Sequence, residues 1–182
     1  FILFPYELFK DSPYWIPPLI REEFALFDRN KNPAFEFCKL RQWIVRKNGK
    51  TAGRIAGIIH KHEVDSINTG RFGWIDFVDD PKVSKLLLDQ VEDWFKEMGI
   101  EHIHGPFGFC EMDPAGMLVE GFDSPGTIAT IYNYSYYQTH LKECGYKKST
   151  DWIEGFGPIP VPPSRLIRAA ELVERRHKVK SI

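Results

Sequence analysis

The stretch between residues 71 and 105 constrains the fold more than any other part of the chain. Residues 71–78 and 100–105 are rich in the apolar and aromatic side chains typical of strands. Asp80 suits a helix N-cap, Pro81 suits the first helical position, and Gly99 suits a helix end. The intervening apolar stripe consists of Val83, Leu87, Val91, Trp94 and Met98, widened by Leu86 and Phe95. A strand, a helix and a strand with short links predict a βαβ unit, whose two strands are parallel.

A β-hairpin is predicted before this unit. Residues 43–46 favour a strand, Asn48-Gly49 is a favoured two-residue turn, and residues 51–60 continue as the partner strand. Glycines 53 and 57 share one face of that partner strand, and alanines 52 and 56 share the other. Such small residues indicate either the close approach of a ligand or another backbone, or a helix packed tightly on the sheet. On the third strand, side chains 72, 74 and 76 are expected on one face.

The remaining segments give weaker patterns. Residues 1–10 are consistent with a short helix interrupted near Pro5, and residues 20–27 with a second helix. Residues 131–144 predict an aromatic-rich helix and residues 146–153 a further strand. We expect one domain over residues 1–157. Residues 158–182 would be a proline-rich linker, an amphipathic helix at 165–176 and the opening strand of a second domain, so the chain is expected to be part of a longer protein.

Composition excludes several classes of partner. The chain has 24 Lys and Arg against 25 Asp and Glu, for a formal charge of -1 and a pI near 6.7. Neither nucleic acid nor an anionic membrane is therefore an expected partner, and no apolar run approaches the ~20 residues of a membrane helix. The three cysteines are far apart, which argues against a disulfide framework or a cysteine zinc site and suits a reducing cytoplasm.

The order of these elements resembles the GNAT acyltransferase superfamily. Residues 48–53, Asn-Gly-Lys-Thr-Ala-Gly, look like the second hairpin of that family, and residues 71–99 look like its central strand and cofactor-binding helix. Residues 132–134, Tyr-Asn-Tyr, followed by residues 141–146, Leu-Lys-Glu-Cys-Gly-Tyr, look like its fourth helix. The resemblance is closest to a bacterial branch with tandem domains. It implies an α/β (α+β) fold with a mixed central sheet flanked by helices and a splayed pair of parallel strands.

The resemblance also implies a cofactor site. In the GNAT superfamily an acyl-CoA lies in the gap between the splayed strands, and its pyrophosphate contacts amides at a helix N-terminus, where unpaired donors face the anion. Backbone N–H groups near Phe77 and Val78 would then polarise the thioester carbonyl. The residues that would contact the cofactor are Phe77, Val78, Lys82, Ser84, Lys85 and Asn133.

The sequence departs from the family pattern at this helix. The expected glycine-rich turn is replaced by Asp79-Asp80-Pro81. Proline has no N–H, an aspartate cap occupies an amide that a phosphate would use, and two carboxylates repel the pyrophosphate. Lys82, Ser84 and Lys85 would offset part of this effect. The turn is therefore also consistent with an ordinary capped structural helix.

Proton transfer is a second departure. Many relatives carry a tyrosine four residues before the glycine that ends the fourth helix, and here that position is Leu141. Tyr136 and Tyr137 lie about one turn earlier, where they would substitute as the acid or simply pack. A carboxylate near the central strand would deprotonate the attacking amine, and Asp76 and Glu111 are the candidates.

Residues 106–131 lack any regular pattern, and a loop of this length is usually functional. The loop follows a strand, so it is expected over the carboxyl end of that strand, where ligands bind in open α/β sheets. Trp74, Asp113 and Glu120 are the candidate substrate-binding residues, because aromatic rings and carboxylates suit an amine. The alternative is a structural loop whose Asp and Gly residues form turns.

Two pairs of histidines also have the spacing of a metal site. His60 and His62, like His102 and His104, lie on one face of a strand, and neighbouring strands would bring the four together. The competing interpretation, polar positions at strand ends, is preferred, so no metal is predicted.

These observations lead to two hypotheses about function. The first is transfer of an acyl group from acetyl-CoA or another acyl-CoA to a small-molecule amine. The second is a degenerate domain without catalysis that serves as a ligand-binding or scaffolding half for a downstream domain. The Asp79-Asp80-Pro81 turn and Leu141 favour the second hypothesis, whereas the order of the elements favours the first.

Overall fold

The computed structural model describes residues 1–155, 157–158 and 161–177. The chain divides into two compact units, Phe1–Lys147 and Lys148–Ile182. The second unit contains the amphipathic helix α6, Ser164–His177, close to its expected bounds. Residues 159–160 of the expected linker and residues 178–182 of the expected opening strand lie outside the described residues. No helix in the described part of the chain is long and apolar enough to span a bilayer.

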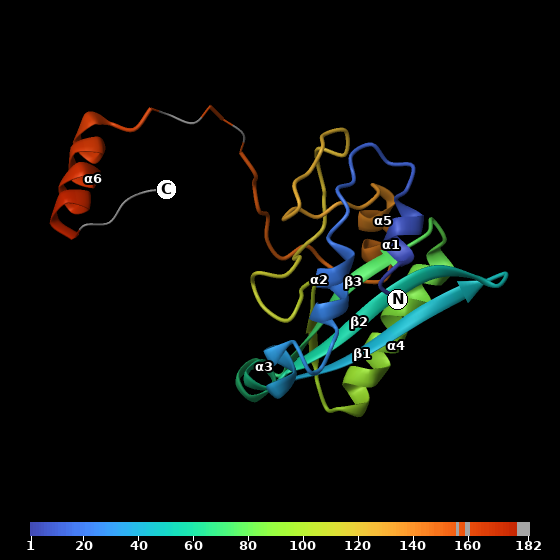
Figure 1. The fold of residues 1–182 in the computed structure, drawn as a ribbon. Coiled ribbons are helices and arrows are strands. Elements are labelled where there is room, and N and C mark those ends of the chain that lie inside the picture. The colour runs from blue at the N-terminus through green and yellow to red at the C-terminus, as the bar shows by residue number, and fades with distance from the viewer. Residues whose placement is uncertain (156, 159–160, 178–182) are drawn as a thin grey trace. The chain divides into compact units, whose positions relative to one another are not determined.

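The first unit is built on a four-stranded mixed sheet (Figure 1). Its order is β1-β2-β3-β4, with antiparallel pairing except between β3 and β4, which are parallel as predicted. The strands are β1 Cys38–Lys47, β2 Lys50–His60, β3 Thr69–Phe77 and β4 His102–His104. The helices of this unit are α1 Phe4–Leu8, α2 Ile20–Leu26, the 3-10 helix Pro33–Glu36, α3 Lys61–Ile67, α4 Pro81–Glu97 and α5 Tyr136–Glu143.

The hairpin and the long helix follow the predictions closely. Asn48 and Gly49 have φ angles of 52° and 79°, the left-handed values that a type I′ turn requires. The Asp80 carboxylate accepts a hydrogen bond from the Lys82 amide at 3.0 Å and so caps α4. Gly99, with φ of 73°, ends the helix in the left-handed conformation.

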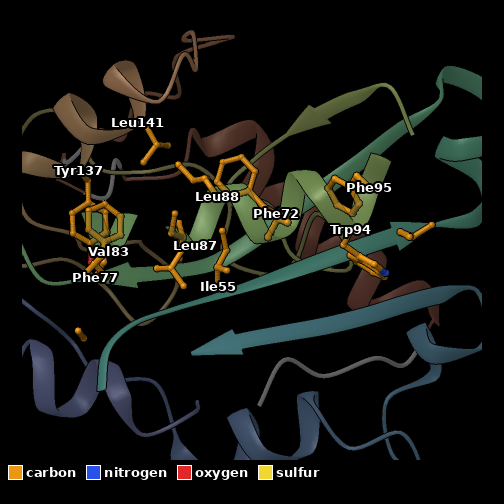
Figure 2. Close-up of a cluster of buried hydrophobic side chains, with 14 of the residues drawn as sticks. Ile55, Phe72, Phe77, Val83, Leu87, Leu88, Trp94, Phe95, Tyr137 and Leu141 are labelled. Carbon is orange, nitrogen blue, oxygen red and sulfur yellow. The ribbon is translucent and has the colours of Figure 1, made fainter. Parts of the chain in front are cut away.

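The small residues of β2 make room for α4. A Cβ atom on Gly53 would lie 2.8 Å from Leu87, and one on Gly57 would lie 2.9 Å from Trp94. The tightly packed helix is therefore the correct one of the two interpretations of this strand. Most of the predicted stripe of α4 fills the main core together with residues of β2, β3 and α5 (Figure 2). The side chains labelled there are Ile55, Phe72, Phe77, Val83, Leu87, Leu88, Trp94, Phe95, Tyr137 and Leu141. Two of the predicted members of the stripe, Leu86 and Met98, are instead exposed.

A β-bulge interrupts β3. The pairing with β2 shifts register between Arg54 and Ala56, and Trp74 has a left-handed φ of 45°. Phe72 therefore packs into the main core, whereas Trp74 packs into a smaller cluster around Phe109. The prediction that side chains 72, 74 and 76 share a face was wrong, because the extra residue reverses the alternation.

Two predicted elements after the long loop differ from the structure. Helix α5 begins at Tyr136 instead of residue 131, because the buried side chain of Asn133 bonds to the backbone of Leu118 and Tyr134 and holds this stretch non-helical. The strand expected at 146–153 does not form. Tyr146 packs its ring on Phe72 and donates to Glu92, but the Lys-Lys-Ser-Thr-Asp run that follows has no apolar face to bury.

Candidate functional site

The candidate site begins where β3 and β4 separate. The two strands pair only from Thr69 to Arg71 on β3, and β3 then continues to Phe77 without a partner in β4. Phe107 closes the first part of this edge by donating its N–H to the Phe72 carbonyl at 2.7 Å. The splayed parallel pair is thus present, and its open end lies beside the first turn of α4.

Helix α5 occupies the open end of β3. The Tyr137 hydroxyl accepts a hydrogen bond from the Phe77 N–H at 3.1 Å, and the Tyr136 hydroxyl donates to the Phe77 carbonyl at 2.7 Å. The Val78 N–H donates to the Ala52 carbonyl at 2.9 Å. Both amides expected to polarise a thioester carbonyl therefore have protein partners in this structure. Burial raises the pKa of both tyrosines, so each phenol is protonated at neutral pH.

A buried serine and histidine lie under the first turn of α4. The Ser84 hydroxyl lies 2.9 Å from Nδ1 of His140, and Nε2 of His140 lies 3.0 Å from a carboxylate oxygen of Asp79. Ser84 also donates to the Pro81 carbonyl at 3.2 Å. The His140 ring stacks on Phe77, with ring centroids 5.2 Å apart. Ser84 is only 1% exposed, so its hydroxyl links α4 to α5 instead of facing a ligand.

The second aspartate of the turn is held by other partners. Besides the Lys82 amide, the Asp80 carboxylate binds the Lys47 ammonium at 2.6 Å. The hydrogen bond from Lys47, followed by that from the Lys82 amide, lowers the pKa of Asp80. The Asp79 carboxylate therefore faces His140, and the Asp80 carboxylate faces Lys47. The open end of β3 is closed by Tyr136 and Tyr137, and not by these aspartates.

The other residues expected to contact a cofactor lie in different surroundings. The Lys85 ammonium pairs with both carboxylate oxygens of Asp89 at 2.7 Å. Asn133 is 2% exposed and fixes the end of the long loop. Lys82 is exposed at the start of α4, and its ammonium makes no ion pair with another described residue. Of the two lysines expected to bind phosphate, Lys82 is thus the one whose ammonium has no carboxylate partner among the described residues.

The two candidate proton acceptors differ sharply in position. Asp76, 8% exposed, binds Nε of Arg54 at 2.6 Å. Arg54 also donates to the Phe1 carbonyl at 3.3 Å and lies over the Phe1 ring. Glu111 is exposed on the long loop. The structure therefore brings Asp76 to the end of β3, already paired with a cation, and leaves Glu111 outside this group.

The expected substrate-binding residues have different surroundings. The Asp113 carboxylate accepts a hydrogen bond from the Cys110 N–H at 3.1 Å, which is a turn contact within the loop. Glu120 is exposed. The Trp74 ring packs between Phe27 and Phe109, and its indole N–H is buried without a hydrogen-bond partner among the described residues. A buried donor without a partner is costly, which makes Trp74 a feature to explain.

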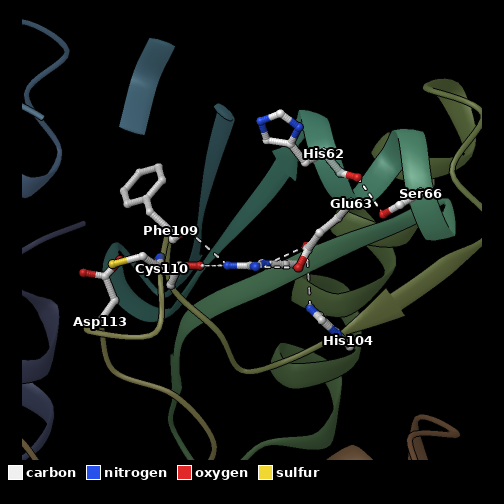
Figure 3. A network of polar contacts seen from close by, with 9 residues as sticks. His62, Glu63, Ser66, His104, Phe109, Cys110 and Asp113 are labelled. Atoms are coloured by element: carbon white, nitrogen blue, oxygen red, sulfur yellow. Dashed lines mark hydrogen bonds and ion pairs between the residues drawn. The ribbon is translucent and has the colours of Figure 1, made fainter. Parts of the chain in front are cut away.

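A partly buried ion pair anchors the start of the long loop (Figure 3). Arg71 on β3 donates through Nε to Glu63 at 2.7 Å and through Nη1 to the carbonyls of Gly108 and Phe109 at 3.1 Å. Burial alone would raise the pKa of Glu63, but the hydrogen bonds and charge of Arg71 hold that pKa below its usual range. His104 lies 3.9 Å from Glu63, and burial lowers the pKa of its imidazole.

The four histidines do not converge. His60 ends β2 and His62 lies in α3, so the prediction that both lie on one face of a strand was wrong, although their ring centroids are 5.6 Å apart. Strand β3 separates β2 from β4, which carries His102 and His104. Among the described residues, no three His, Cys, Asp or Glu side chains come together as a metal site.

Sequence reasoning missed three residues near the end of β3. Glu23 on α2 is 9% exposed, Arg54 on β2 is 5% exposed, and His140 on α5 is 4% exposed. A signal existed for two of them. Arg54 interrupts a run of small and apolar residues, and Glu23 precedes Leu26 and Phe27 by three and four positions and so shares their face of α2.

Two bacterial proteins are similar to this chain in sequence. Protein YghO of Escherichia coli (strain K12) is 36% identical over 154 residues, which are 83% of this chain and 39% of that protein. A bacterial ceramide synthase of Caulobacter vibrioides is 31% identical over 154 residues, which are 83% of this chain and 40% of that protein. The chain thus spans about two fifths of the length of these relatives. No family model matches it.

A structural comparison finds a distant likeness. An aminoglycoside acetyltransferase from an uncultured soil metagenomic sample, solved in complex with trehalose, aligns over 87% of this chain and 86% of its own, with a TM-score of 0.45 and 8% identity.

The arrangement of the chain itself has the order expected of the superfamily. A hairpin leads into a central strand, a helix starts at its carboxyl end, and a short parallel strand separates from it. The mixed α/β fold and the splayed parallel pair that the resemblance implied are therefore present. The gap between the parallel strands faces Tyr136, Tyr137 and the first turn of α4.

Proposed function

We propose that this domain takes part in the transfer of an acyl group from an acyl-CoA to an amine. The observation that carries the proposal is the 31% identity with a bacterial ceramide synthase over 154 residues. A stretch that covers 83% of this chain includes the whole sheet, which lies between Cys38 and His104. A ceramide is the amide of a fatty acid and a long-chain amino alcohol, so a synthase of ceramides forms a bond between an acyl carbon and an amine nitrogen.

In this proposal the amine nitrogen attacks the thioester carbonyl carbon. The carbon–nitrogen bond forms, the carbon–sulfur bond breaks, and the thiolate leaves. Tyr136 is the proposed proton donor to the sulfur, since its protonated hydroxyl lies at the open end of β3. The proton that the nitrogen loses after the attack replaces the one that Tyr136 gives up.

The proposed carrier site lies at the first turn of α4. Lys82 would pair with a phosphate of the carrier, with Ser84 and Lys85 near it on the same helix. The Phe77 N–H is the proposed donor to the thioester carbonyl, in exchange for its bond to Tyr137, and the Val78 N–H lies one residue further. Asn133, which fixes the loop before α5, would act by holding Tyr136 in position.

The test measures release of free thiol from a fatty acyl-CoA with a long-chain amino alcohol as acceptor. Tyr136→Phe is expected to lower kcat by roughly 100-fold or more, because general acid catalysis contributes on that order. Tyr132→Phe is the control, since the Tyr132 hydroxyl makes no hydrogen bond with another described residue. Equal kcat for both variants would contradict the role of Tyr136.

Binding of the carrier is tested separately by thermal shift. CoA at ~100 times its dissociation constant stabilises a protein by about 2.7 kcal/mol. Absence of a shift at millimolar CoA, together with absence of thiol release, would instead support the alternative of a ligand-binding or scaffolding half within a longer protein.

A further inference from the structure

Helix α2 carries a buried acidic residue toward the end of β3. On this helix Leu26 packs against the cluster that contains Trp74, and the Phe27 ring, just after the helix, lies 4.9 Å from the Trp74 ring. Glu23 precedes these residues by three and four positions, so it faces the sheet one turn earlier along the helix. Its exposed fraction is 9%. The charges of Arg54 and Asp76 both act on the Glu23 carboxyl, so Glu23 lies near this pair.

The charges around Glu23 do not balance. Asp76 and Arg54 form a buried pair at 2.6 Å, with exposed fractions of 8% and 5%. Two carboxylates and one guanidinium leave a net charge of -1 when both acids are ionised. Within the described residues, no donor forms a hydrogen bond with the Glu23 carboxylate. A buried ionised carboxylate without a partner is strongly disfavoured, so this cluster lacks one positive charge.

The electrostatics agree with this count. Burial, the largest effect, raises the pKa of Glu23, and the charges of Asp76 and Asp113 raise it further against the opposing effect of Arg54. The Tyr6 hydroxyl on α1 is the remaining titratable neighbour, and it donates to the Pro18 carbonyl instead of to Glu23. These effects favour the protonated form of Glu23 more strongly than that of an exposed glutamate, and a nearby cation would oppose them.

A second group without a partner lies on the same side of the sheet. The indole N–H of Trp74 is buried and makes no hydrogen bond with any residue that the structure describes. The Glu23 carboxylate can accept a hydrogen bond from an ammonium group, and the Trp74 N–H can donate one to a hydroxyl or carbonyl oxygen. Together they suit a ligand that carries both an ammonium group and such an oxygen.

We propose that Glu23, beside the Arg54–Asp76 pair, binds the ammonium group of the acceptor amine and accepts its proton. The proton moves from the ammonium nitrogen to a carboxylate oxygen of Glu23, which leaves a neutral carboxyl and an amine with a free lone pair. Asp76 keeps Arg54 as its partner, so it contributes negative charge without accepting the proton. This role rests on the proposed acyl transfer, but the ammonium site itself does not depend on an acyl donor.

Binding is tested with hexylamine as the probe and hexanol as its uncharged counterpart, by calorimetry on the protein without an acyl donor. Hexylamine should bind and hexanol should not. Glu23→Gln should weaken hexylamine binding by about 10- to 100-fold, as expected for the loss of a hydrogen bond to a charged group. Glu22→Gln, on the exposed neighbour in the same helix, should leave the affinity within about twofold. Equal affinities for the Glu23 variant and the unchanged protein would overturn the proposal, as would absence of hexylamine binding.

A measurement on the unchanged protein avoids dependence on folding of the variant. With carbon-13 in the glutamate carboxyl groups, the Glu23 resonance should report a pKa above that of Glu22, and saturating hexylamine should return that pKa toward the ordinary value. A Glu23 resonance that does not respond to hexylamine would also overturn the proposal.

Acyl transfer gives an independent outcome. In the thiol-release assay, kcat should fall as pH drops through the pKa of Glu23, and Glu23→Gln should abolish this acidic limb. If Glu23→Gln keeps full kcat and the same fall of kcat at low pH, Glu23 is not the proton acceptor, and the proposed acyl transfer is unaffected by that result. Hexylamine binding at Glu23 without any thiol release would leave the ammonium site in place and remove the proposed function.

Discussion

Replacing Tyr137 with Phe tests the contact that closes the open end of β3. The Tyr137 side chain is 1% exposed, its ring stacks on Phe77 with centroids 4.2 Å apart, and its hydroxyl is the partner of the Phe77 N–H. Tyr137→Phe keeps the ring and the stacking but removes the acceptor. The Phe77 N–H then remains buried without a partner, which costs about 1–3 kcal/mol of unfolding free energy.

The assay is reversible unfolding by urea, with thermal unfolding as a second measurement. For a chain of this size about 1 kcal/mol corresponds to about 2–4 °C in Tm, so the expected decrease is roughly 2–12 °C. Tyr132→Phe is the matched control, since the hydroxyl that it removes makes no hydrogen bond within the described part of the chain and belongs to a ring in the same aromatic group. It should cost less than about 0.5 kcal/mol. Equal stability of the two variants would refute the reasoning, because it would mean that the Phe77 N–H gains nothing from Tyr137.

Three further predictions concern other parts of the first unit. Gly73→Ala should destabilise by about 3 kcal/mol or more in urea unfolding, because its Cβ would lie 2.3 Å from the backbone oxygen of Phe107. Glu63→Gln should cost about 3 kcal/mol at pH 7, because it leaves the buried Arg71 without its carboxylate. The pKa of Glu63 is lower in the folded state than in the unfolded state. The stabilisation is therefore complete above the unfolded pKa of about 4.3 and is lost as pH falls through the folded pKa. Urea unfolding of the variant and the unchanged protein at pH 7 and pH 3 will measure this loss. Cys38, whose pKa burial raises to about 11, should resist a thiol reagent at pH 8 until the protein unfolds.

Local signals were sufficient for the elements whose causes are local. The Asn48-Gly49 turn and the capped start of α4 follow from two or three neighbouring residues, and both predictions were confirmed. The bulge at Trp74 has no local signal, because its register shift is set by pairing with β2 and by the packing of Phe109 and Phe27. The late start of α5 likewise depends on Leu118, fifteen residues before Asn133.

The candidate site was harder to predict because its partners are distant in sequence. Glu23 lies 53 positions from Asp76 and 31 from Arg54, and no spacing rule connects an acid on a short helix with a salt bridge on the sheet. The sequence signal that was available is Arg54, a single charged residue within the run of small and apolar residues of β2. A buried Arg requires a carboxylate partner, and the adjacent strand offers Asp76. Recognising that Arg54 is buried would therefore have been enough to predict the Arg54–Asp76 pair.

The paired aspartates illustrate how distant partners change the chemistry that a motif implies. From the sequence, Asp79 and Asp80 are two free carboxylates that repel an anion at the start of α4. In the structure Lys47, 33 positions away, binds Asp80, and His140, 61 positions away, contacts Asp79. Each carboxylate thus has a cationic or N–H partner before any ligand arrives. A phosphate approaching Lys82 would meet a turn whose negative charge is already partly compensated, and removing Lys47 or His140 should therefore weaken CoA binding more at low than at high ionic strength, because salt screens the exposed charges.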